Sequence, residues 1–389
     1  MSLRFLTAGE SHGAALIAVL DGLPSGLRVD YTFIDQELRR RQRGYGAGPR
    51  MKLEEDHVVF LGGIMEGSTI GAPLAMLIEN RDHERWKGKP IDAMTIPRPG
   101  HADLTATLKY GYRDLRPALE RASARETAAR VAVGAVCKLY LQQFGIRVEG
   151  YVRSIAEIEG QIEAIPMEER FKRAEDSPLR CPDERSAENM QARIRRAMQE
   201  KETLGGVLEV LAFGVPPGLG SHVQWDRRLE ARLGAAILSV QAIKGVEIGR
   251  AFENTRLNGT QAQDGIYLEG ERLVRRTQRS GGIEGGISTG EPISVHAAMK
   301  PIATTLTPQP SVDLLEGKET QTRYERSDFC PVPRAVPILE AMVAYVLADA
   351  LIEKLGGDSL AEQRQRFEQL PKMSLENFSL DGGGHLFWE

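Results

Sequence analysis

One segment of the sequence, residues 122–144, is apolar or small around almost its whole helical circumference. Val131 and Val136 supply large apolar side chains, and alanines and a glycine fill many of the positions between them. At its start Ser123 is followed three residues later by Glu126, the spacing of a capping box, which predicts a helix over residues 122–144. A helix that is apolar on all sides is buried between other layers of structure. We therefore expect a layered fold built around this helix.

Two pairs of segments resemble each other in the same order along the chain. Residues 13–27 resemble residues 205–219, and in each an apolar run leads into a turn with the pattern Gly-x-Pro-x-Gly. Residues 62–73 resemble residues 281–292, each with a Gly-Gly-Ile start and a Gly-x-Pro end. Chance coincidence of glycines and prolines is the alternative, but two matches in one order indicate an internal duplication with two similar halves.

The remaining hydrophobic pattern predicts an α/β protein. Further helices are predicted over residues 32–43, 182–203, 226–242 and 337–354, and strands over residues 207–213 and 292–299. The helix over residues 337–354 is rich in Ala, Val and Leu and is expected to be internal. Buried helices flanked by strands indicate a layered α/β arrangement. We expect one domain over residues 1–357, with halves at about 1–145 and 200–357, and a polar tail over residues 358–389.

The basic residues are unevenly distributed although the net charge is small. The 389 residues include 50 Lys+Arg against 54 Asp+Glu, a net charge of −4, and 38 of the basic residues are Arg. A nucleic-acid-binding protein would carry a positive excess, so this class is disfavoured. Codon usage is one explanation for the many arginines. Residues 39–130, however, hold 17 basic against 12 acidic residues, which favours a local anion site.

The cysteines and the start of the chain bear on the compartment. Cys137, Cys181 and Cys330 are widely spaced and form no Cys-x-x-Cys pair, which favours a reducing compartment and argues against a disulfide framework or a thiolate zinc site. The histidines lack metal-ligand spacing, so no metal site is expected. The first residues lack a signal-peptide pattern and no uninterrupted apolar run reaches about 18 residues. We expect a cytoplasmic protein without a membrane segment.

Two histidines lie in settings that favour a site. Ser11 and His12 stand in a polar interruption, bracketed by glycines, between two strand-like runs. His101 lies in a proline-glycine loop three residues after Arg98. Histidine is the natural proton donor near neutral pH, although a loop histidine can also be merely exposed.

Three further patterns are weaker when taken singly. Arg121 and Arg125 flank the start of the buried helix, where free N–H groups can bind phosphate, but they also fit an ordinary cap with surface arginines. Residues 281–290 contain five glycines without a Walker A or G-x-G-x-x-G pattern. Asp349 lies on an otherwise apolar helix, where a buried acid needs a partner or a function and a solvent-facing position is equally compatible.

Together these motifs resemble those of the chorismate synthase family, in the family's order and over nearly the whole chain to about residue 355. The matching segments are residues 7–13, 40–42, 98–103, 121–127, 281–290, 300–301 and 326–337. The resemblance implies a β-α-β sandwich with internal helices between sheets, and a homotetramer. It also implies a 1,4-anti elimination of phosphate from the small-molecule substrate 5-enolpyruvylshikimate 3-phosphate, giving chorismate. Reduced FMN is required, although the reaction is redox-neutral overall.

The resemblance also implies roles for individual residues. His12 would protonate the departing phosphate and His101 would supply a proton to the reduced flavin. Ser11 and Ser123 would assist proton relay, and Asp349 would tune flavin N5. The arginines implied to hold substrate carboxylates and phosphate are Arg41, Arg50, Arg98, Arg125 and Arg326. The flavin contacts implied are Arg121, Ala122, Ser123, Gln241, Ala242, Gly285, Lys300, Pro301, Ile302, Ala303, Thr304 and Arg326.

One departure and two alternative functions remain open at this stage. Many relatives carry a substrate-contacting arginine where this chain has Ala47, and a lost charged contact costs roughly 1.5–3 kcal/mol of binding. A flavin- and NADPH-using oxidoreductase is the alternative enzyme. An RNA-binding surface at residues 39–52 is the alternative from another class, but no aromatic residues are interleaved as in single-strand binders. Whether NADPH reduces the flavin on this chain is likewise open.

Overall fold

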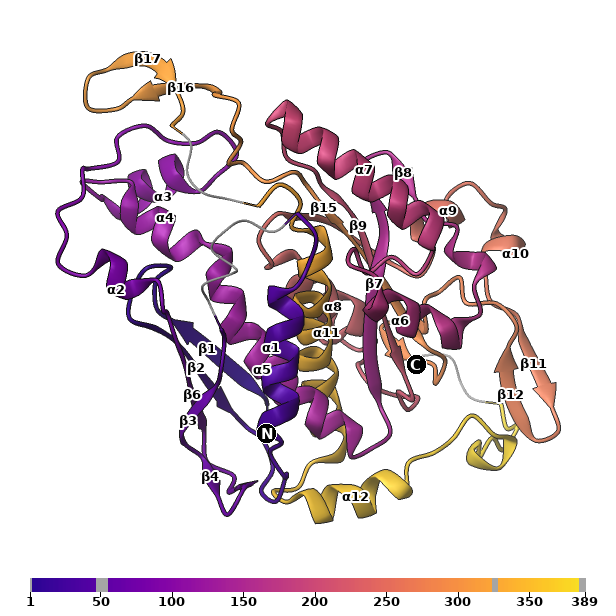
Figure 1. Cartoon of the computed structure of the whole chain (residues 1–389). Coiled ribbons are helices and arrows are strands. Elements are labelled where there is room, and N and C mark those ends of the chain that lie inside the picture. The colour runs from indigo at the N-terminus through magenta and orange to yellow at the C-terminus, as the bar shows by residue number, and fades with distance from the viewer. Residues whose placement is uncertain (1, 47–54, 324–327, 385–389) are drawn as a thin grey trace.

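Two antiparallel sheets enclose a layer of helices in the computed structural model, which describes residues 2–46, 55–323 and 328–384. The first sheet has the order β1 (Arg4–Ala8), β2 (Ala15–Asp21), β6 (Leu74–Glu79), β3 (Val59–Gly62). The second has the order β10 (Ile243–Ile248), β15 (Ile293–Met299), β9 (Gly206–Phe213), β7 (Arg147–Ile155), β8 (Ile158–Glu159). Between them lie α1 (Tyr31–Gln42), α5 (Thr127–Gln142), α8 (Leu229–Leu238) and α11 (Val332–Leu355) (Figure 1). The predicted sandwich of sheets around internal helices is confirmed.

The central helices α5 and α11 are buried along most of their length. Gly134 of α5 lies against Ala341 of α11, and a Cβ added at Gly134 would stand 2.2 Å from the Cβ of Ala341. Helix axes can approach this closely only where one side chain is absent. The apolar circumference read from the sequence is therefore explained by contact with neighbours on every side.

The start of the central helix differs from the expectation. The chain ends α4 (Arg116–Ala122), is extended at Ser123, makes one 3-10 turn and only then enters α5. The Ser123 hydroxyl accepts a hydrogen bond from the Arg125 N–H at 3.3 Å. Glu126 does not close the predicted capping box, because its carboxylate instead binds Thr7 and Arg130. The single helix predicted over residues 122–144 was wrong at its first five residues.

The two halves of the chain share a strand order and a turn. The order β1-β2-β6-β3 in the first sheet corresponds to β7-β9-β15-β10 in the second. The Thr69 hydroxyl donates to the carbonyl of Pro24 at 2.7 Å, and the Ser288 hydroxyl donates to the carbonyl of Pro216 at 2.6 Å. These four residues occupy matching places in the two repeated motifs. The same turn is therefore held by the same kind of hydrogen bond in each half.

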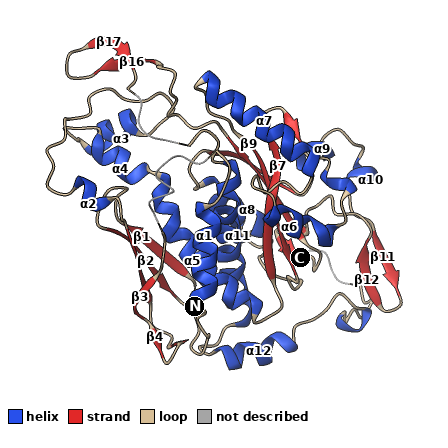
Figure 2. Cartoon of the chain, viewed as in Figure 1, coloured by secondary structure: helices blue, strands red, loops and turns tan. Residues whose placement is uncertain are grey.

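The other predicted elements are present with shifted ends (Figure 2). The helices predicted over residues 32–43, 182–203 and 337–354 are α1, α7 (Glu184–Glu200) and α11, and the two predicted strands are β9 and β15. The helix predicted over residues 226–242 is shorter, because η4 (Trp225–Arg227) precedes α8 and the chain turns after Leu238 toward Ala242, whose φ is +65°.

Smaller elements lie around the sandwich. They are β4 (Ile64–Met65), β5 (Ser68–Thr69), α2 (His83–Trp86), α3 (Asp103–Tyr110), η2 (Ala124–Glu126), η3 (Ile162–Ala164), α6 (Met167–Asp176), α9 (Ala251–Asn254), α10 (Gly259–Ala262), β11 (Ile266–Glu269), β12 (Arg272–Arg275), β13 (Ile283–Glu284), β14 (Ile287–Ser288), β16 (Pro310–Asp313), β17 (Lys318–Gln321), α12 (Leu360–Glu368) and η5 (Leu375–Asn377). Within the segment expected to be a polar tail, Gln363 of α12 is buried and accepts a hydrogen bond from the Tyr140 hydroxyl at 2.7 Å. The start of this segment is thus attached to the helical layer.

One helix among the described residues, α11, is long and apolar enough to cross a membrane. Of the 18 residues in the most apolar stretch of this helix, 89% are buried inside the fold. Such burial is typical of a core helix, since a spanning helix would expose this surface to lipid.

The contact at Gly134 predicts opposite effects for two glycine-to-alanine changes. Gly134→Ala adds a methyl group into Ala341 and should destabilise the protein by about 1–3 kcal/mol. Gly234→Ala is the control, because the Cβ added to this α8 glycine meets no heavy atom within 4 Å. It should leave stability unchanged or raise it by up to about 1 kcal/mol. Urea unfolding measures both, and equal stability of the two variants would contradict the close packing.

Candidate functional site

Polar side chains gather where the turn between β1 and β2 meets the break between α4 and α5. His12 lies in this turn, and its ring Nδ1 is 2.7 Å from Glu120 Oε1. The His12 backbone N–H donates to the other oxygen of the same carboxylate at 2.8 Å. The Ser123 hydroxyl donates to that of Ser11 at 3.2 Å. The structure thus brings together three predicted residues, Ser11, His12 and Ser123, and adds Glu120, which sequence reasoning missed.

A buried carboxylate holds two of the predicted arginines beside this turn. Asp56 accepts hydrogen bonds from Arg41 Nη2 at 2.7 Å and from Arg125 Nη1 at 2.6 Å. Burial alone would raise the pKa of Asp56, but the two guanidinium charges bring it below its usual value. Burial lowers the pKa of Arg41 to about 10 despite the attraction of Asp56. Two cations on one anion leave a net positive charge, as an anion site requires.

Asn80 connects the arginine pair to the histidine turn. Its amide oxygen accepts from Arg125 Nε at 2.7 Å, and its amide nitrogen donates to the carbonyls of Glu10 and Gly13 at 3.1 and 2.8 Å. The turn that carries His12 is therefore fixed to Arg125. We call this group the His12 cluster; its members are Ser11, His12, Arg41, Asp56, Asn80, Glu120, Ser123 and Arg125.

The second predicted histidine lies in another carboxylate-centred group. Asp103 accepts from Arg98 Nε at 2.8 Å, and its other oxygen is 2.6 Å from His101 Nδ1. Burial would raise the pKa of Asp103, but the hydrogen bonds from His101 and Arg98 lower it overall. Arg98 also donates to the Thr304 hydroxyl at 3.0 Å, and Lys300 Nζ donates to the Gly100 carbonyl at 2.8 Å. The residues Arg98, His101, Asp103, Lys300 and Thr304 are called the His101 cluster.

Hydrogen bonds link predicted flavin-contact residues between the two clusters. The Lys300 N–H donates to the Ala242 carbonyl at 2.9 Å, and the neighbouring Gln241 amide donates to Glu126 at 3.4 Å. Glu126 binds the hydroxyl of Thr7, which also accepts from Arg121 at 2.9 Å.

Gln241 Oε1 is a buried acceptor with no hydrogen-bond donor among the described residues. A flavin ring carries N–H donors, and a flavin phosphate requires cations such as Arg121 and Lys300. The residues present therefore fit this cofactor.

Other residues of the predicted set lie along the same segments. Ala122 is the last residue of α4, next to Ser123. Pro301, Ile302 and Ala303 connect Lys300 to Thr304, and the Ile302 carbonyl accepts a hydrogen bond from the Thr203 hydroxyl at 2.9 Å.

Asp349 is not brought to either cluster by its described contacts. Its carboxylate accepts from the Leu3 N–H at 2.6 Å and from Arg232 Nη2 at 2.5 Å. Arg334, on the same helix, donates to the Arg41 carbonyl at 3.1 Å. Fifteen residues of α-helix separate Asp349 from Arg334, a rise of about 22 Å. The solvent-facing alternative does not hold either, because the Asp349 side chain is only 17% exposed and has Arg232 as its partner.

Gly285 also lies away from Lys300 and the His101 cluster. It occupies the turn between β13 and β14, a hairpin joined to the Ile293 end of β15. Lys300 follows the other end of that strand, so about 20 Å of strand separates them. Arg50 and Arg326, together with Ala47, lie outside the described residues.

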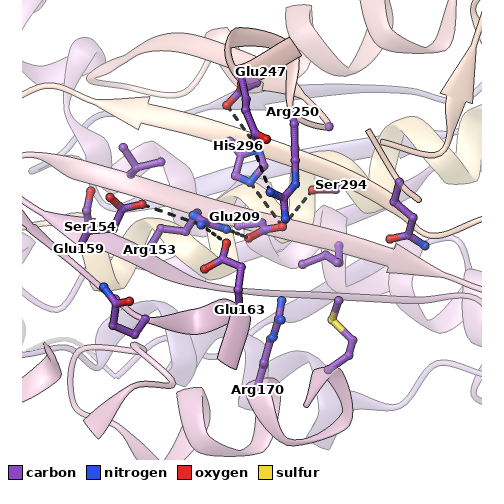
Figure 3. Close-up of a pocket in the computed structure, with 18 residues that line it drawn as sticks. Arg153, Ser154, Glu159, Glu163, Arg170, Glu209, Glu247, Arg250, Ser294 and His296 are labelled. Atoms are coloured by element: carbon purple, nitrogen blue, oxygen red, sulfur yellow. Dashed lines mark hydrogen bonds and ion pairs between the residues drawn. The ribbon is translucent and has the colours of Figure 1, made fainter. Parts of the chain in front are cut away.

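A cavity of about 690 Å³ opens on the outer face of the second sheet, away from the predicted residues (Figure 3). Its floor holds Glu209, which accepts from Arg153 at 2.8 Å, from Tyr151 at 2.7 Å and from Ser294 at 2.9 Å. The lining as a whole holds five carboxylates, Glu159, Glu163, Glu209, Glu247 and Glu253, against three arginines, Arg153, Arg170 and Arg250, an excess of acidic residues that disfavours an anion. The cavity therefore does not compete with the two histidine clusters as the predicted anion site.

The acidic residues and the amide of the two clusters were not singled out from the sequence. Asp103 belongs to the Arg98–Asp103 motif, so its pairing with His101 had a local signal. Asp56, Asn80 and Glu120 had none, because their partners lie 15 to 108 residues away along the chain. Among the described residues no group of three or more His, Cys, Asp or Glu is arranged to hold a metal ion.

The comparisons with known proteins agree with one another. A sequence model of the family described as chorismate synthase matches residues 3–352. The chorismate synthase of Desulforudis audaxviator (strain MP104C) is 49% identical over 370 residues, 92% of this chain and 95% of its own length. The chorismate synthase of Aquifex aeolicus (strain VF5) is 50% identical over 386 residues, which cover 94% of this chain and 96% of that protein. A crystal structure of chorismate synthase is 44% identical, with a TM-score of 0.78 and coverage of 95% and 97%.

Removing the shared carboxylate should destabilise the fold. Asp56→Asn leaves the buried Arg41 and Arg125 facing each other without a counter-charge, which should cost about 3–5 kcal/mol. Asp21→Asn is the control, because its partner Arg4 is exposed and such surface pairs contribute at most about 1 kcal/mol. Urea unfolding at pH 7 compares the two, and an equal loss would contradict a buried bridge.

The buried charge of Asp56 also predicts that the stability difference between wild type and Asp56→Asn depends on pH. The pKa of Asp56 is lowered in the folded state, whereas an unfolded Asp titrates near about 3.9. Its contribution to stability is thus present above about pH 4 and is lost as the pH falls through the lower folded value. The stability difference between wild type and Asp56→Asn should narrow between about pH 5 and pH 3. A difference independent of pH would show that the charge of Asp56 is not involved.

Proposed function

The chain belongs to the chorismate synthase family of shikimate-pathway lyases, and we propose that the His12 and His101 clusters together form the site of its reaction. In that reaction 5-enolpyruvylshikimate 3-phosphate loses its phosphate and a hydrogen from C6, and chorismate forms. The substrate is a small molecule that carries a phosphate and two carboxylates. It therefore needs several cationic hydrogen-bond donors.

One observation carries the proposal: the buried Asp56 holds Arg41 and Arg125 together beside the turn of His12. Guanidinium groups held in place before a ligand arrives lose little side-chain entropy on binding it. In a site with little water each anion contact is also stronger. Arg98, fixed by Asp103, extends the set of donors to the second cluster. Arg50 and Arg326 remain predicted members of this set.

Proton transfer is assigned to the two histidines. His12 would protonate the departing phosphate, with Ser11 and Ser123 as the hydroxyl relay beside it. His101 would supply a proton to the reduced cofactor. Each ring has a carboxylate at Nδ1, which fixes the orientation of the imidazole.

Reduced FMN is the proposed cofactor, since the unsatisfied Gln241 oxygen and the cations Arg121 and Lys300 fit it. When bound, reduced FMN would supply an electron and recover it, so that no net oxidation occurs. Ala122, Ser123, Ala242 and residues 301–304 lie beside these groups. For Asp349 and Gly285 a flavin role remains a prediction, because their described partners lie elsewhere. Whether NADPH supplies the reducing electrons is a separate question.

We also propose a homotetramer, with one interface on the first sheet. The alternation of burial places Leu6, Ile17 and Val59 on the face turned away from the helices, and all three are exposed. Exposed apolar side chains on neighbouring strands are typical of a surface that another subunit covers. The cytoplasm is the expected compartment.

The organisation into two halves of one domain over residues 1–357 is proposed as the result of internal duplication. Its support is the shared strand order and the matching hydroxyl-to-carbonyl hydrogen bonds. The first half, at about residues 1–145, would end just after α5. The second half, at about residues 200–357, would begin just before β9.

The histidine roles predict a specific pattern of activities. His12→Ala and His101→Ala should retain FMN binding and lose about 10²- to 10⁴-fold in chorismate formation with photoreduced FMN. His222→Ala is the control, because His222 is exposed and belongs to neither cluster. Wild-type turnover in either of the first two variants would refute the role assigned to that histidine.

The same assay separates this function from a flavin- and NADPH-using oxidoreductase. Stopped-flow spectra should show reduced FMN unchanged after each turnover of the lyase, whereas an oxidoreductase would oxidise it once per turnover. Running the assay with NADPH and without photoreduction tests whether this chain reduces its own flavin.

A further inference from the structure

Both carboxylate oxygens of Glu120 bind the same residue, His12. Glu120 Oε1 lies 2.7 Å from the ring Nδ1, and Oε2 accepts the backbone N–H at 2.8 Å. The Glu120 carbonyl also accepts the N–H of Ser11 at 3.2 Å. Glu120 thus fixes both the backbone and the ring of the residue that it contacts.

Other groups hold the ring and its turn from the opposite side. The His12 carbonyl accepts a hydrogen bond from His83 Nδ1 at 2.9 Å. The ring packs against Trp86, with centroids 4.9 Å apart. Nε2 is 3.9 Å from the buried carboxylate of Asp82, which is itself bound by Trp86 Nε1 at 3.3 Å. The imidazole is therefore held in one orientation by contacts on several sides.

The chemistry of a carboxylate decides which ring nitrogen carries the proton. An ionised carboxylate can only accept hydrogen bonds, so the Nδ1 facing Glu120 must be an N–H. Burial raises the pKa of Glu120, but the hydrogen bonds from His12 outweigh it and lower the pKa overall, so Glu120 stays ionised near neutral pH. Nε2 is then the nitrogen that can gain and release a proton.

We propose that Glu120 is a positioning residue that keeps the Nδ1 proton of His12 in place, so that Nε2 delivers the proton of the reaction. This rests on the proposed role of His12 as the acid for the departing phosphate. Glu120 is assigned no contact with the substrate, because His12 engages both of its carboxylate oxygens. It acts by orienting the ring and by balancing the positive charge that the ring carries before it gives up its proton.

The location of Glu120 gives it a second consequence. It lies in the last turn of α4, three residues before Ser123 at the break that leads into α5. The same turn of helix thus orients the acid and places the hydroxyl that donates to Ser11. A change at Glu120 should therefore alter the proton-transfer step rather than the arginines around Asp56.

Glu120→Gln tests the proposal because the amide has nearly the same shape but no charge. The amide replaces one of the two carboxylate oxygens by an NH2 group, so one of the two His12 N–H groups faces a donor and loses its acceptor. We expect kcat for chorismate formation to fall by about 10- to 100-fold, with KM for the substrate unchanged within about twofold, since Glu120 does not bind substrate. Glu84→Gln is the matched control, because the Glu84 side chain is exposed, and it should behave like wild type.

A direct measurement on the unmodified enzyme does not depend on whether the variant folds. Selective ¹⁵N-histidine NMR, with His12 assigned by the signal lost in His12→Asn, reports which ring nitrogen carries the proton in the neutral form. We expect Nδ1–H in wild type and a mixture or Nε2–H in Glu120→Gln. An Nε2–H tautomer in wild type would overturn the proposal.

The outcomes separate this proposal from the function assigned to His12. If His12→Ala is inactive but Glu120→Gln keeps full kcat and the wild-type tautomer, Glu120 does not position His12. If His12→Ala keeps full activity while the tautomer still changes in Glu120→Gln, the contact is real and the acid role of His12 is wrong. A fall in kcat with a parallel rise in KM would indicate a general distortion of the site and would also count against the proposal.

Discussion

Any side chain at Gly134 would overlap Ala341, so α5 and α11 lie in direct contact at the centre of the molecule. Both sheets pack on the layer that these helices define (Figure 1). A buried charge network fastens α1 to it: Glu340 of α11 accepts from Lys138 of α5 at 2.5 Å and from Arg40 of α1 at 2.6 Å. Three helices from distant parts of the chain are thereby fixed relative to one another.

This arrangement determines where the arginines of the site can be. Arg41 follows Arg40 in the last turn of α1, so the residue next to the charge network reaches Asp56. Arg334, in the first turn of α11, binds the carbonyl of Arg41. Arg125 lies just before α5. The ends of three helices that pack together thus converge on one place, although they are far apart in sequence.

Carboxylates organise the cationic groups at each point of the site. Asp56 holds two arginines, Asp103 holds Arg98 and His101, and Glu120 holds His12. A cluster of buried cations with no anion would be unstable before its substrate arrived. One carboxylate shared between donors keeps them ionised and in place while leaving a positive excess for a polyanionic ligand.

The sequence by itself determined α1, α5, α7, α11, β9 and β15 with shifted ends, the repeated turns, and the motifs that carry Ser11, His12, Arg98, His101 and Arg125, because periodicity and local motifs are encoded over short stretches. Only the tertiary structure decided what each side chain binds. Glu126 could have capped its own helix, yet it binds Thr7 and Arg130. Asp349 could have faced solvent, yet it pairs with Arg232. Glu120 meets His12 across 108 residues. A side chain takes the partner that packing brings closest, and packing joins segments whose separation no local pattern records.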